Sequence, residues 1–393
     1  MSQELPPLAP LVEPLPHLTE LQARIGARHT SLPGIGETGQ GRLAAARVLI
    51  IGAGGLGSPL ALYLAAAGIG HLDIIDGDTI EESNLQRQII HRWQNAGKNK
   101  AISAVEQVQA LNPSIKARAH PFYLTPHNIE NLLASYDLII DGSDNFATRY
   151  LVADTCEILG KPLIWGTLSQ YTAQATVFWS APRYLNSHPR QGWSLRDLYP
   201  DMPHPQSVPT CAAGGVLGSL CGTVGSIMAT EAIKLITGLP QPLLGTLWLF
   251  DARTATTRTL TITPDPNRQP TRNLKTALAE IQRYSSEQDS QQVPSISYED
   301  LRLNRERYQL LDVRSPDERR GGHYEHDQHL PLDQLLAELS KGRTLGELME
   351  NPSELPLVVY CAAGSRSARA VQAILASTPN QKIYSLTGGW KPF

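Results

Sequence analysis

The sequence is poor in cysteine, in clustered basic residues and in long apolar runs, and each shortage argues against one class of protein. Its 393 residues include four cysteines, at positions 156, 211, 221 and 361, with no close pair. This argues against a disulfide framework and suits a cytoplasmic setting. The net charge is -3 without a basic block, which argues against nucleic-acid binding. No run of roughly 20 apolar residues predicts a membrane span. The N-terminus lacks the apolar stretch of a secretory signal.

The remaining composition is that of a globular protein with more than one domain. Hydrophobic residues make up 41% and charged residues 18% of the chain, and the length suggests two or three domains. Residues 1–19 begin with a proline-rich stretch and are predicted to form a flexible lead. We expect one α/β domain over 20–265 and a smaller one over 295–393. Between them, the polar and proline-containing stretch 266–294 is predicted to be a linker.

Short apolar runs alternate with amphipathic segments from about Leu43 onward, which is typical of a Rossmann-like doubly wound α/β sheet. The first domain is expected to have helices over 58–67 and 214–237 and strands over 46–51, 71–76, 137–141, 162–165, 173–179 and 247–250. In the linker we expect one short helical patch over 274–284. In the second domain we expect strands over 308–313 and 357–360 and a helix over 367–376.

The segment Gly52-x-Gly54-Gly55-x-Gly57 lies between the first predicted strand and the first predicted helix. Glycines there let the backbone approach a phosphate, and the helix N-terminus presents free amides to it. Asp76 ends the next strand, where a carboxylate can bind ribose hydroxyls. These features alone fit an NAD(P)-dependent oxidoreductase as well as any other nucleotide-binding enzyme.

Further polar residues follow the glycine segment, and they favour ATP cleavage over hydride transfer. They are Asp78, Asn84, Arg87, Gln88, Lys100, Asp144 and Asn145. When a carboxylate attacks ATP, two anions meet, so cations must neutralise the triphosphate and a carboxylate must hold a metal ion. The alternative is that Arg87 and Lys100 are solvated surface charges.

With these motifs the sequence resembles the MoeB/ThiF family, the bacterial relatives of ubiquitin-activating enzymes. The resemblance covers about residues 28–265 and rests on "RVLIIGAGGLGSPLALYLAAAGIG", "IIDGDTIEESNLQRQ", "DLIIDGSDNFATRY" and "VLGSLCGTVGSIMATEAIKLITG". It implies that Gly54 and Gly55 line an ATP site and that Asp76 takes the ribose. It also implies that Asp144 holds Mg²⁺ and that the phosphates contact Asn84, Arg87 and Lys100.

The same resemblance implies a reaction and a partner. The C-terminal glycine carboxylate of a ubiquitin-like carrier (MoaD or ThiS type, ending in Gly-Gly) would attack the α-phosphate of ATP and release pyrophosphate. Arg28 matches an arginine that such enzymes insert into the partner subunit's site, which implies a homodimer. Here Ile25-Gly26 stands where the family usually has Arg-Tyr.

Many members of the family carry two Cys-x-x-Cys pairs that form a structural zinc site. This chain has no thiol at the four corresponding positions, which are Ser194, Asp197, Arg268 and Thr271. We therefore predict that structural zinc is absent. The two histidines near these positions, His188 and His204, are not expected to replace the missing ligands.

Two cysteines of the first domain are interpreted as core residues and one as reactive. Cys211 lies in a loop before a glycine-rich helix start, where amide dipoles favour the thiolate. Its position resembles the family's crossover-loop cysteine, which bonds transiently to the activated carrier. An inert, partly buried thiol is the alternative. Cys156 and Cys221 lie in apolar helical patterns and are predicted to be core packing.

Cys361 follows a predicted strand, and the segment Cys361-x4-Arg366 leads into a predicted helix. Such a turn surrounds a sulfur with backbone amides and stabilises an anionic persulfide. The segment 295–393 resembles a rhodanese domain, with "LLDVRSPDE" as its second hallmark and Asp312 and Arg314 supporting the fold. Related phosphatases have a loop one residue longer, and Ser367 stands where their arginine would be. The stretch "GGHYEHDQHLPL" departs from the family, so an inactive docking module stays an alternative.

Together the two domains predict an adenylyltransferase and sulfurtransferase that turns the carrier's C-terminus into a thiocarboxylate, with sulfur from a Cys361 persulfide. Holding a persulfide near a hydrolysable acyl adenylate raises its effective concentration. The sulfur donor would be a cysteine desulfurase or thiosulfate. The family serves molybdopterin, thiamine or cysteine synthesis or tRNA thiolation, and the sequence does not choose among them. A carrier-activating protein without thiolation and an oxidoreductase remain alternatives.

Overall fold

The computed structural model describes residues 8–184, 192–203, 215–290 and 293–392, except 352, 354, 363 and 380. The chain divides into two compact units, Met1–Tyr284 and Ser285–Phe393. Each unit is an α/β structure built around one sheet. The mixed α/β class with a smaller second α/β domain, predicted from the sequence, is confirmed.

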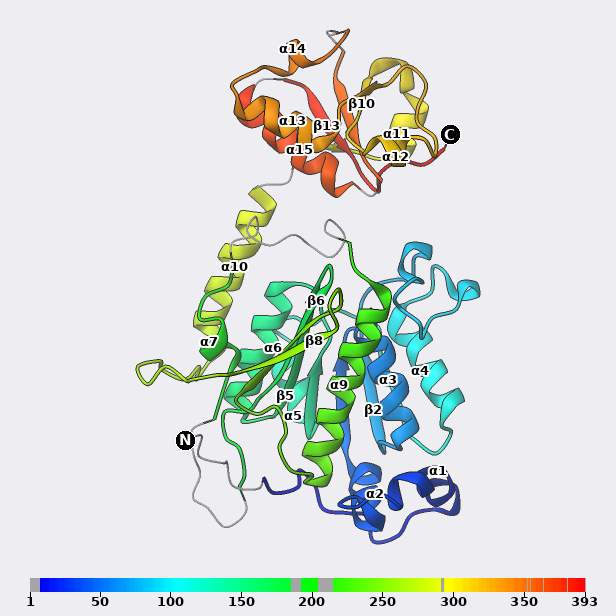
Figure 1. The fold of residues 1–393 in the computed structure, drawn as a ribbon, viewed down its shortest axis with the longest axis vertical. Coiled ribbons are helices and arrows are strands. Elements are labelled where there is room, and N and C mark those ends of the chain that lie inside the picture. Colours follow the sequence, from blue (N-terminus) through cyan, green and yellow to red (C-terminus); the bar gives the residue numbers. More distant parts are fainter. Residues whose placement is uncertain are drawn as a thin grey trace. The chain divides into compact units, whose positions relative to one another are not determined.

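The first unit contains an eight-stranded sheet in the order β3-β2-β1-β4-β5-β6-β7-β8 (Figure 1). Its parallel half consists of β1 (Arg47–Ile51), β2 (His71–Ile75), β3 (Ala119–His120), β4 (Leu138–Asp141) and β5 (Leu163–Ser169). Its antiparallel half continues from β5 through β6 (Thr172–Phe178), β7 (Thr246–Asp251) and β8 (Thr256–Thr261). The strand order reverses between β1 and β4, where open α/β sheets bind ligands.

Helices cover both faces of this sheet, as Figure 1 shows. One face carries α3 (Gly57–Ala67), α4 (Lys100–Leu111) and α9 (Gly218–Thr237), and the other carries α5 (Ile129–Ala134) and α6 (Phe146–Leu159). Alternate residues of β1 enter the two cores, Val48 and Ile50 on the α3 side and Leu49 and Ile51 on the α6 side. This burial on both faces explains why β1 has a continuous apolar sequence.

The N-terminal segment differs from the expected flexible lead. From Leu8 onward it lies on the first unit, because Leu11 is buried in the core and the backbone amides of Ala9 and Leu11 donate to Arg183 and Leu235. Two helices follow, α1 (Glu20–Thr30) and α2 (Gly36–Ala45). The side-chain amide of Gln40 in α2 donates to the carbonyl of Ala67 at the end of α3.

The expected linker also contains more structure than one short helical patch. The helix α10 spans Leu274–Ser290, and Leu274 and Ala277 are buried in the same core cluster as α6. The first unit accordingly runs to Tyr284, beyond the expected end of the first domain at 265. A short helix, α7 (Leu195–Leu198), lies beside this segment and contacts α6.

The second unit has a five-stranded parallel sheet in the order β11-β10-β12-β13-β9. Its strands are β9 (Ser295–Ile296), β10 (Gln309–Asp312), β11 (Gln328–His329), β12 (Leu357–Tyr360) and β13 (Ile383–Leu386). Its helices are α11 (Tyr298–Leu303), α12 (Pro316–Arg319), α13 (Leu332–Ser340), α14 (Leu345–Leu348) and α15 (Ser365–Ser377). The central strand β12 is buried along its whole length.

One helix of the described residues, α9, is long and apolar enough to cross a membrane by length and composition. Of its most apolar stretch, 61% is buried inside the first unit, where the helix packs on α3 and on strands β5 and β6. Its apolar character is therefore used within the fold.

Candidate functional site

The glycine turn after β1 has the close backbone packing that its sequence predicts. Gly52 has φ of +87°, a conformation that favours glycine. A side chain at Gly57 would place its Cβ 1.9 Å from the carbonyl oxygen of Gly52. Gly54 has open space instead, with the nearest atom at 3.7 Å from such a Cβ. Gly57 thus closes the turn, whereas Gly54 leaves room above it for a ligand.

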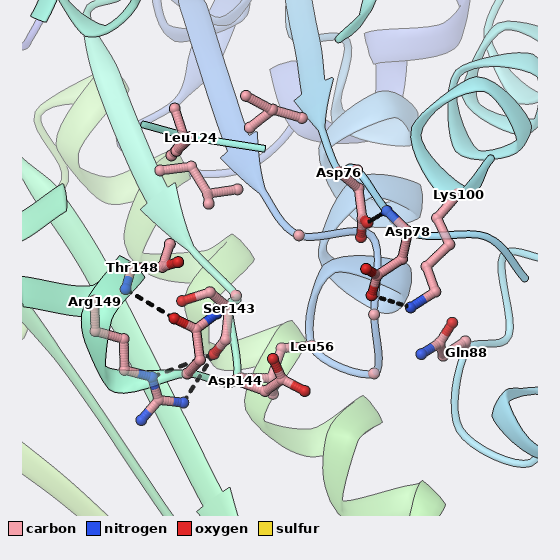
Figure 2. A pocket seen from close by; sticks show the side chains of 18 of the residues that line it. Leu56, Asp76, Asp78, Gln88, Lys100, Leu124, Ser143, Asp144, Thr148 and Arg149 are labelled. Atoms are coloured by element: carbon pink, nitrogen blue, oxygen red, sulfur yellow. Dashed lines mark hydrogen bonds and ion pairs between the residues drawn. The ribbon is translucent and has the colours of Figure 1, made fainter. Parts of the chain in front are cut away.

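A pocket opens over this turn, where the carboxyl ends of β1, β2 and β4 meet. Eight predicted site residues line it, namely Gly52, Gly54, Gly55, Asp76, Arg87, Lys100, Asp144 and Asn145. Figure 2 shows Asp76, Asp78 and Lys100 on one side of the pocket and Ser143, Asp144 and Arg149 on the other. Residues that lie far apart in the sequence are therefore brought to one place.

Asp76 organises the wall on the β2 side. One carboxylate oxygen accepts from the amide of Ala53 in the glycine turn at 2.8 Å, and the other from the amide of Asp78 at 2.8 Å. Burial raises the pKa of Asp76 against the lowering effect of these hydrogen bonds. His91 contacts the next peptide of the turn, because its Nε2 lies 3.0 Å from the carbonyl oxygen of Ala53. The turn is thus fixed by two side chains that lie 15 residues apart in the sequence.

Two cationic side chains, Lys100 and Arg87, also line the pocket. Lys100, the first residue of α4, is buried and donates to a carboxylate oxygen of Asp78 at 2.8 Å. Arg87 is half-buried and donates to the carbonyl oxygen of Ser83 at 3.2 Å. Neither cation is a fully solvated surface charge, which was the alternative interpretation of this pair.

The opposite wall is formed by the loop after β4. Asp144 is exposed to the pocket, and no hydrogen bond or ion pair is found for its carboxylate within the described part of the chain. Asn145 caps α6 by accepting from the amide of Thr148 at 2.8 Å. Arg149 is buried and donates to the carbonyl oxygen of Ser143 and to the hydroxyl of Thr167. The loop that carries Asp144 is therefore tied to α6 and β5.

Three predicted site residues do not line the pocket. Gly57 lies below the turn, where it packs on Gly52. Asn84 is buried in a short 3₁₀ turn, where it interacts with the amide of Glu81 and the hydroxyl of Ser83. Arg28 is exposed on α1, which packs on α2 near the end of α3, at the sheet edge where β1 and β2 begin. The pocket lies at the opposite edge.

Several residues that line the pocket were given no individual role from the sequence, among them Asp78, Gln88, Phe122, Tyr123, Thr148 and Arg149, although Asp78 and Gln88 belong to the polar set that favoured ATP cleavage. Asp78 and Arg149 stand within motif segments, so their charge was a usable signal. Phe122 and Tyr123 follow the two-residue strand β3, which was not predicted. Their place in the pocket depends on that strand.

The cysteines of the first unit differ in position. Cys156 is buried in the core, as predicted, and burial raises the pKa of its thiol. Cys221 is also buried, on α9, and its sulfur lies 2.8 Å from where a Cβ on Gly55 would stand. It therefore packs against the glycine turn and borders the pocket. Cys211, His188 and His204 lie outside the described residues.

The four positions matched to zinc ligands lie together around an ion-pair network. Arg268 donates to Asp197 at 2.8 Å and to Glu157 at 2.8 Å. The backbone amide of Ser194 donates to Asp197 at 2.7 Å. The hydroxyl of Thr271 lies 3.4 Å from Asp154. Charged side chains thus connect α6, α7 and the segment before α10.

A second arginine completes this network. Arg196 donates to Asp154 at 2.8 Å and to Glu280 of α10 at 2.8 Å. Burial raises the pKa of Asp154 against the lowering effect of Arg196. Within the described part of the chain there is no group of three or more His, Cys, Asp or Glu side chains arranged to hold a metal ion.

In the second unit, Cys361 ends β12 and lies before α15, as the sequence predicts. It is fully buried, and its sulfur accepts from the amide of Gly364 at 3.1 Å. Gly364 has φ of +94°, so the loop turns where only glycine fits readily. The hydroxyl of Ser367 lies 3.7 Å from the sulfur. A backbone amide and a helix N-terminus therefore both face the sulfur, which favours an anion there.

Arg366 and its partner lie at the same loop. The guanidinium binds the carboxylate of Glu318 through two hydrogen bonds, at 2.7 and 2.5 Å. This interaction lowers the pKa of Glu318 to about 2. Behind the loop, Arg314 and Asp312 form a buried bidentate ion pair, which agrees with their predicted structural role.

Two protein-family models match the chain. The ThiF family model matches residues 27–271, and the rhodanese-like domain model matches residues 297–393. Among solved structures, MccB of E. coli has a TM-score of 0.52 at 20% identity, over 66% of this chain and 74% of that one. This likeness concerns the fold.

Curated relatives match in sequence. The protein named probable adenylyltransferase/sulfurtransferase MoeZ of Mycobacterium tuberculosis is 43% identical over 99% of this chain and 96% of its own length. A sulfur carrier protein adenylyltransferase of Thermus thermophilus is 44% identical over 61% of this chain and 87% of its own. The adenylyltransferase and sulfurtransferase MOCS3 of Drosophila sechellia is 36% identical over 92% and 81%.

Proposed function

Because this chain belongs to the ThiF family and ends in a rhodanese-like domain, it is an adenylyltransferase and sulfurtransferase that uses ATP, and we propose its substrate and its chemical steps. The substrate is a ubiquitin-like sulfur carrier of the MoaD or ThiS type. The enzyme adenylates the carrier's C-terminal glycine and then replaces AMP with sulfur from a Cys361 persulfide.

The observation that carries this proposal is the pocket over the glycine turn. It combines a glycine-rich turn, three cationic side chains (Arg87, Lys100 and Arg149) and the carboxylate of Asp144, for which no partner is found in the described residues. Gly54 and Gly55 would let the phosphates approach the backbone, and Asp76 would accept from the ribose. A hydride-transfer enzyme needs no such set of charges, so the pocket favours nucleotide cleavage over oxidoreductase chemistry.

The residues present also fit a magnesium ion carried by the nucleotide. The carboxylate of Asp144 faces the pocket without a protein partner in the described residues, and Arg149 holds its loop in place. Asp144 would hold Mg²⁺, with Asn145 beside it, and the ion would supply neutralising charge at the phosphates. Zinc has no role in this proposal.

In the first step the carrier's carboxylate oxygen attacks the α-phosphorus, and pyrophosphate leaves. Arg87 and Lys100 would share the charge of the leaving group, because both line the pocket. Asn84 was expected to contact phosphate, but its buried place in the 3₁₀ turn supports a role in positioning Arg87 instead. The product is an acyl adenylate.

In the second step the outer sulfur of the Cys361 persulfide attacks the activated carbonyl, and AMP leaves. The amide of Gly364 and the start of α15 would stabilise the persulfide anion, with Arg366 beside it. The acyl disulfide so formed is cleaved by a thiol, and Cys211 is our candidate. This releases the carrier thiocarboxylate and leaves a Cys361–Cys211 disulfide, which an external thiol reduces.

The assembly and the setting are also part of the proposal. Arg28 would act in a second copy's site within a homodimer, since it lies at the sheet edge opposite its own pocket. A cysteine desulfurase or thiosulfate would load Cys361. Persulfide chemistry requires reduced thiols, which places the reaction in the cytoplasm.

The test uses the full chain, ATP-magnesium and a carrier that ends in Gly-Gly. We expect ATP–pyrophosphate exchange that depends on the carrier and, with thiosulfate, a mass gain of about 16 Da on the carrier, the difference between sulfur and oxygen. Cys361→Ala should abolish the mass gain and keep the exchange. Cys156→Ala, which removes a core thiol, serves as the control and should keep both.

Two outcomes would contradict the proposal. Absence of exchange with any Gly-Gly carrier would remove the adenylation step. Full sulfur transfer by Cys361→Ala would leave the rhodanese-like domain as a docking module. That second reading has one observation in its favour, the complete burial of Cys361.

A further inference from the structure

The carboxylate of Asp78 is shared by two residues of the nucleotide pocket. Lys100 donates its ammonium to one oxygen at 2.8 Å, and Tyr123 donates its hydroxyl to the other at 2.6 Å. The Asp78 side chain is 51% exposed, so its direction is fixed by these two partners more than by packing. All three residues line the pocket.

Tyr123 contributes little to the packing of the fold. It is 64% exposed, and its ring lies over the backbone of Gly77, where an added Cβ would come within 2.7 Å of the ring carbons. The ring covers the turn that connects Asp76 to Asp78. Within the described residues, the interaction found for the Tyr123 hydroxyl is its hydrogen bond to Asp78.

Asp78 and a nucleotide would compete for Lys100. Lys100 is 8% exposed, and Asp78 is the partner found for its ammonium within the described residues. The phosphates can attract this ammonium only as far as Asp78 releases it. A donor on the second oxygen of Asp78 draws away part of the carboxylate's charge and so weakens its hold on Lys100.

We propose that Tyr123 is a positioning residue that controls, through Asp78, how readily Lys100 turns to the phosphates of ATP, an inference that rests on the proposed function. Burial raises the pKa of Asp78, but the hydrogen bonds from Lys100 and Tyr123 outweigh this effect and bring the pKa below its ordinary value. The bond to Asp78 raises the pKa of Tyr123, which keeps the phenol protonated and able to donate.

The experiment is a double-mutant cycle on the full chain, with ATP-magnesium affinity measured by calorimetry. Tyr123→Phe should weaken ATP binding about three- to tenfold, as loss of a half-exposed hydrogen bond to a charged group implies. In pyrophosphate exchange the KM for ATP should rise by the same factor, while kcat stays within about twofold. In an Asp78→Asn background the same change should alter the affinity by less than about twofold.

The matched control is Tyr199→Phe. Tyr199 is also partly exposed and donates a 2.6 Å hydrogen bond, to Gln174, but it does not line the pocket. Its loss should leave ATP affinity unchanged. Equal affinity of Tyr123→Phe and wild type would overturn the inference, as would an undiminished effect in Asp78→Asn. If the wild type itself bound no ATP, the proposed function would fail instead.

Discussion

Replacing Arg268 with alanine gives a sharp test of the ion-pair network at the zinc-ligand positions. The side chains of its two partners, Asp197 and Glu157, are 0% and 3% exposed. Without Arg268 two buried carboxylates lose their cation. Breaking a buried pair by removing one partner costs about 3–5 kcal/mol. The alternative is to protonate a carboxylate at pH 7, which costs about 4 kcal/mol relative to the unfolded chain, so it offers no easier route.

We therefore expect Arg268→Ala to lower the unfolding free energy of the first unit by about 3–5 kcal/mol at pH 7. At about 2 °C per kcal/mol for a unit of this size, the Tm falls by roughly 6–10 °C. Tryptophan fluorescence is a suitable probe, because five of the six tryptophans precede Tyr284. Arg268→Lys, whose ammonium can reach one carboxylate at a time, should have a Tm between those of the wild type and Arg268→Ala.

The pH dependence of this loss is a second readout. The orphaned carboxylates of the variant should have raised pKa values, so they bind protons more readily as the pH falls. The difference in Tm between wild type and Arg268→Ala should then shrink from pH 7.5 to pH 5. Arg253→Ala is the control, since Arg253 and Asp251 form an exposed ion pair and its loss should leave the Tm unchanged. A fall of under 2 °C for Arg268→Ala would refute the reasoning.

Three further predictions follow from the two units. Gly57→Ala, whose Cβ would stand 1.9 Å from the Gly52 carbonyl, should abolish ATP binding or soluble expression, whereas Gly54→Ala should fold with an unchanged Tm. The pKa of Glu318, about 2 through its hydrogen bonds with Arg366, lies below its ordinary 4.5, so its contribution to stability is present above pH 4.5 and is lost as the pH falls toward 2. Acid unfolding of Glu318→Gln should show a flatter profile over that range, and an identical profile would contradict the assignment. Dialysis against EDTA should leave the Tm within about 1 °C, because we predict that structural zinc is absent and ion pairs of Arg196 and Arg268 connect α6, α7 and the segment before α10; elemental analysis that found zinc would contradict this.

The parts of the fold that the sequence predicts are those with their own local signal. Strands β1 and β4 are apolar runs that are largely buried on both faces, and β2 contributes the buried residues Leu72, Ile74 and Ile75. Each strand was expected within two residues of its observed bounds. Strand β8 has no such signal, because Thr256–Thr261 is exposed along its whole length. It is formed by antiparallel pairing with β7 across the short turn 252–255, and not by burial of an apolar face.

The residues of the candidate site also fall into those with a local sequence signal and those without one. Glycine spacing and the order of charged residues predicted eight pocket residues, since those types are required by nucleotide chemistry itself. Tyr123 was not predicted because its partner Asp78 lies 45 residues away in the sequence. Arg149 is similar, because its role depends on the β4 loop and on Thr167 of β5. Residues that act on other side chains need the fold before they can be recognised.

The four positions matched to zinc ligands show the same difference between local sequence signals and contacts that need the fold. The sequence shows that thiols are absent, but the carboxylates that meet Arg268 and Arg196 come from three segments, with Glu157 lying 111 residues from Arg268. Four acids share two arginines there, so negative charge is in excess; burial raises the pKa of Asp154, and the neighbouring Glu157 and Glu280 raise it further. A cluster with more carboxylates than cations has little tolerance for losing a cation. Its charge excess is the physical reason why removing Arg268 should cost the full amount of about 3–5 kcal/mol that is typical of a broken buried ion pair.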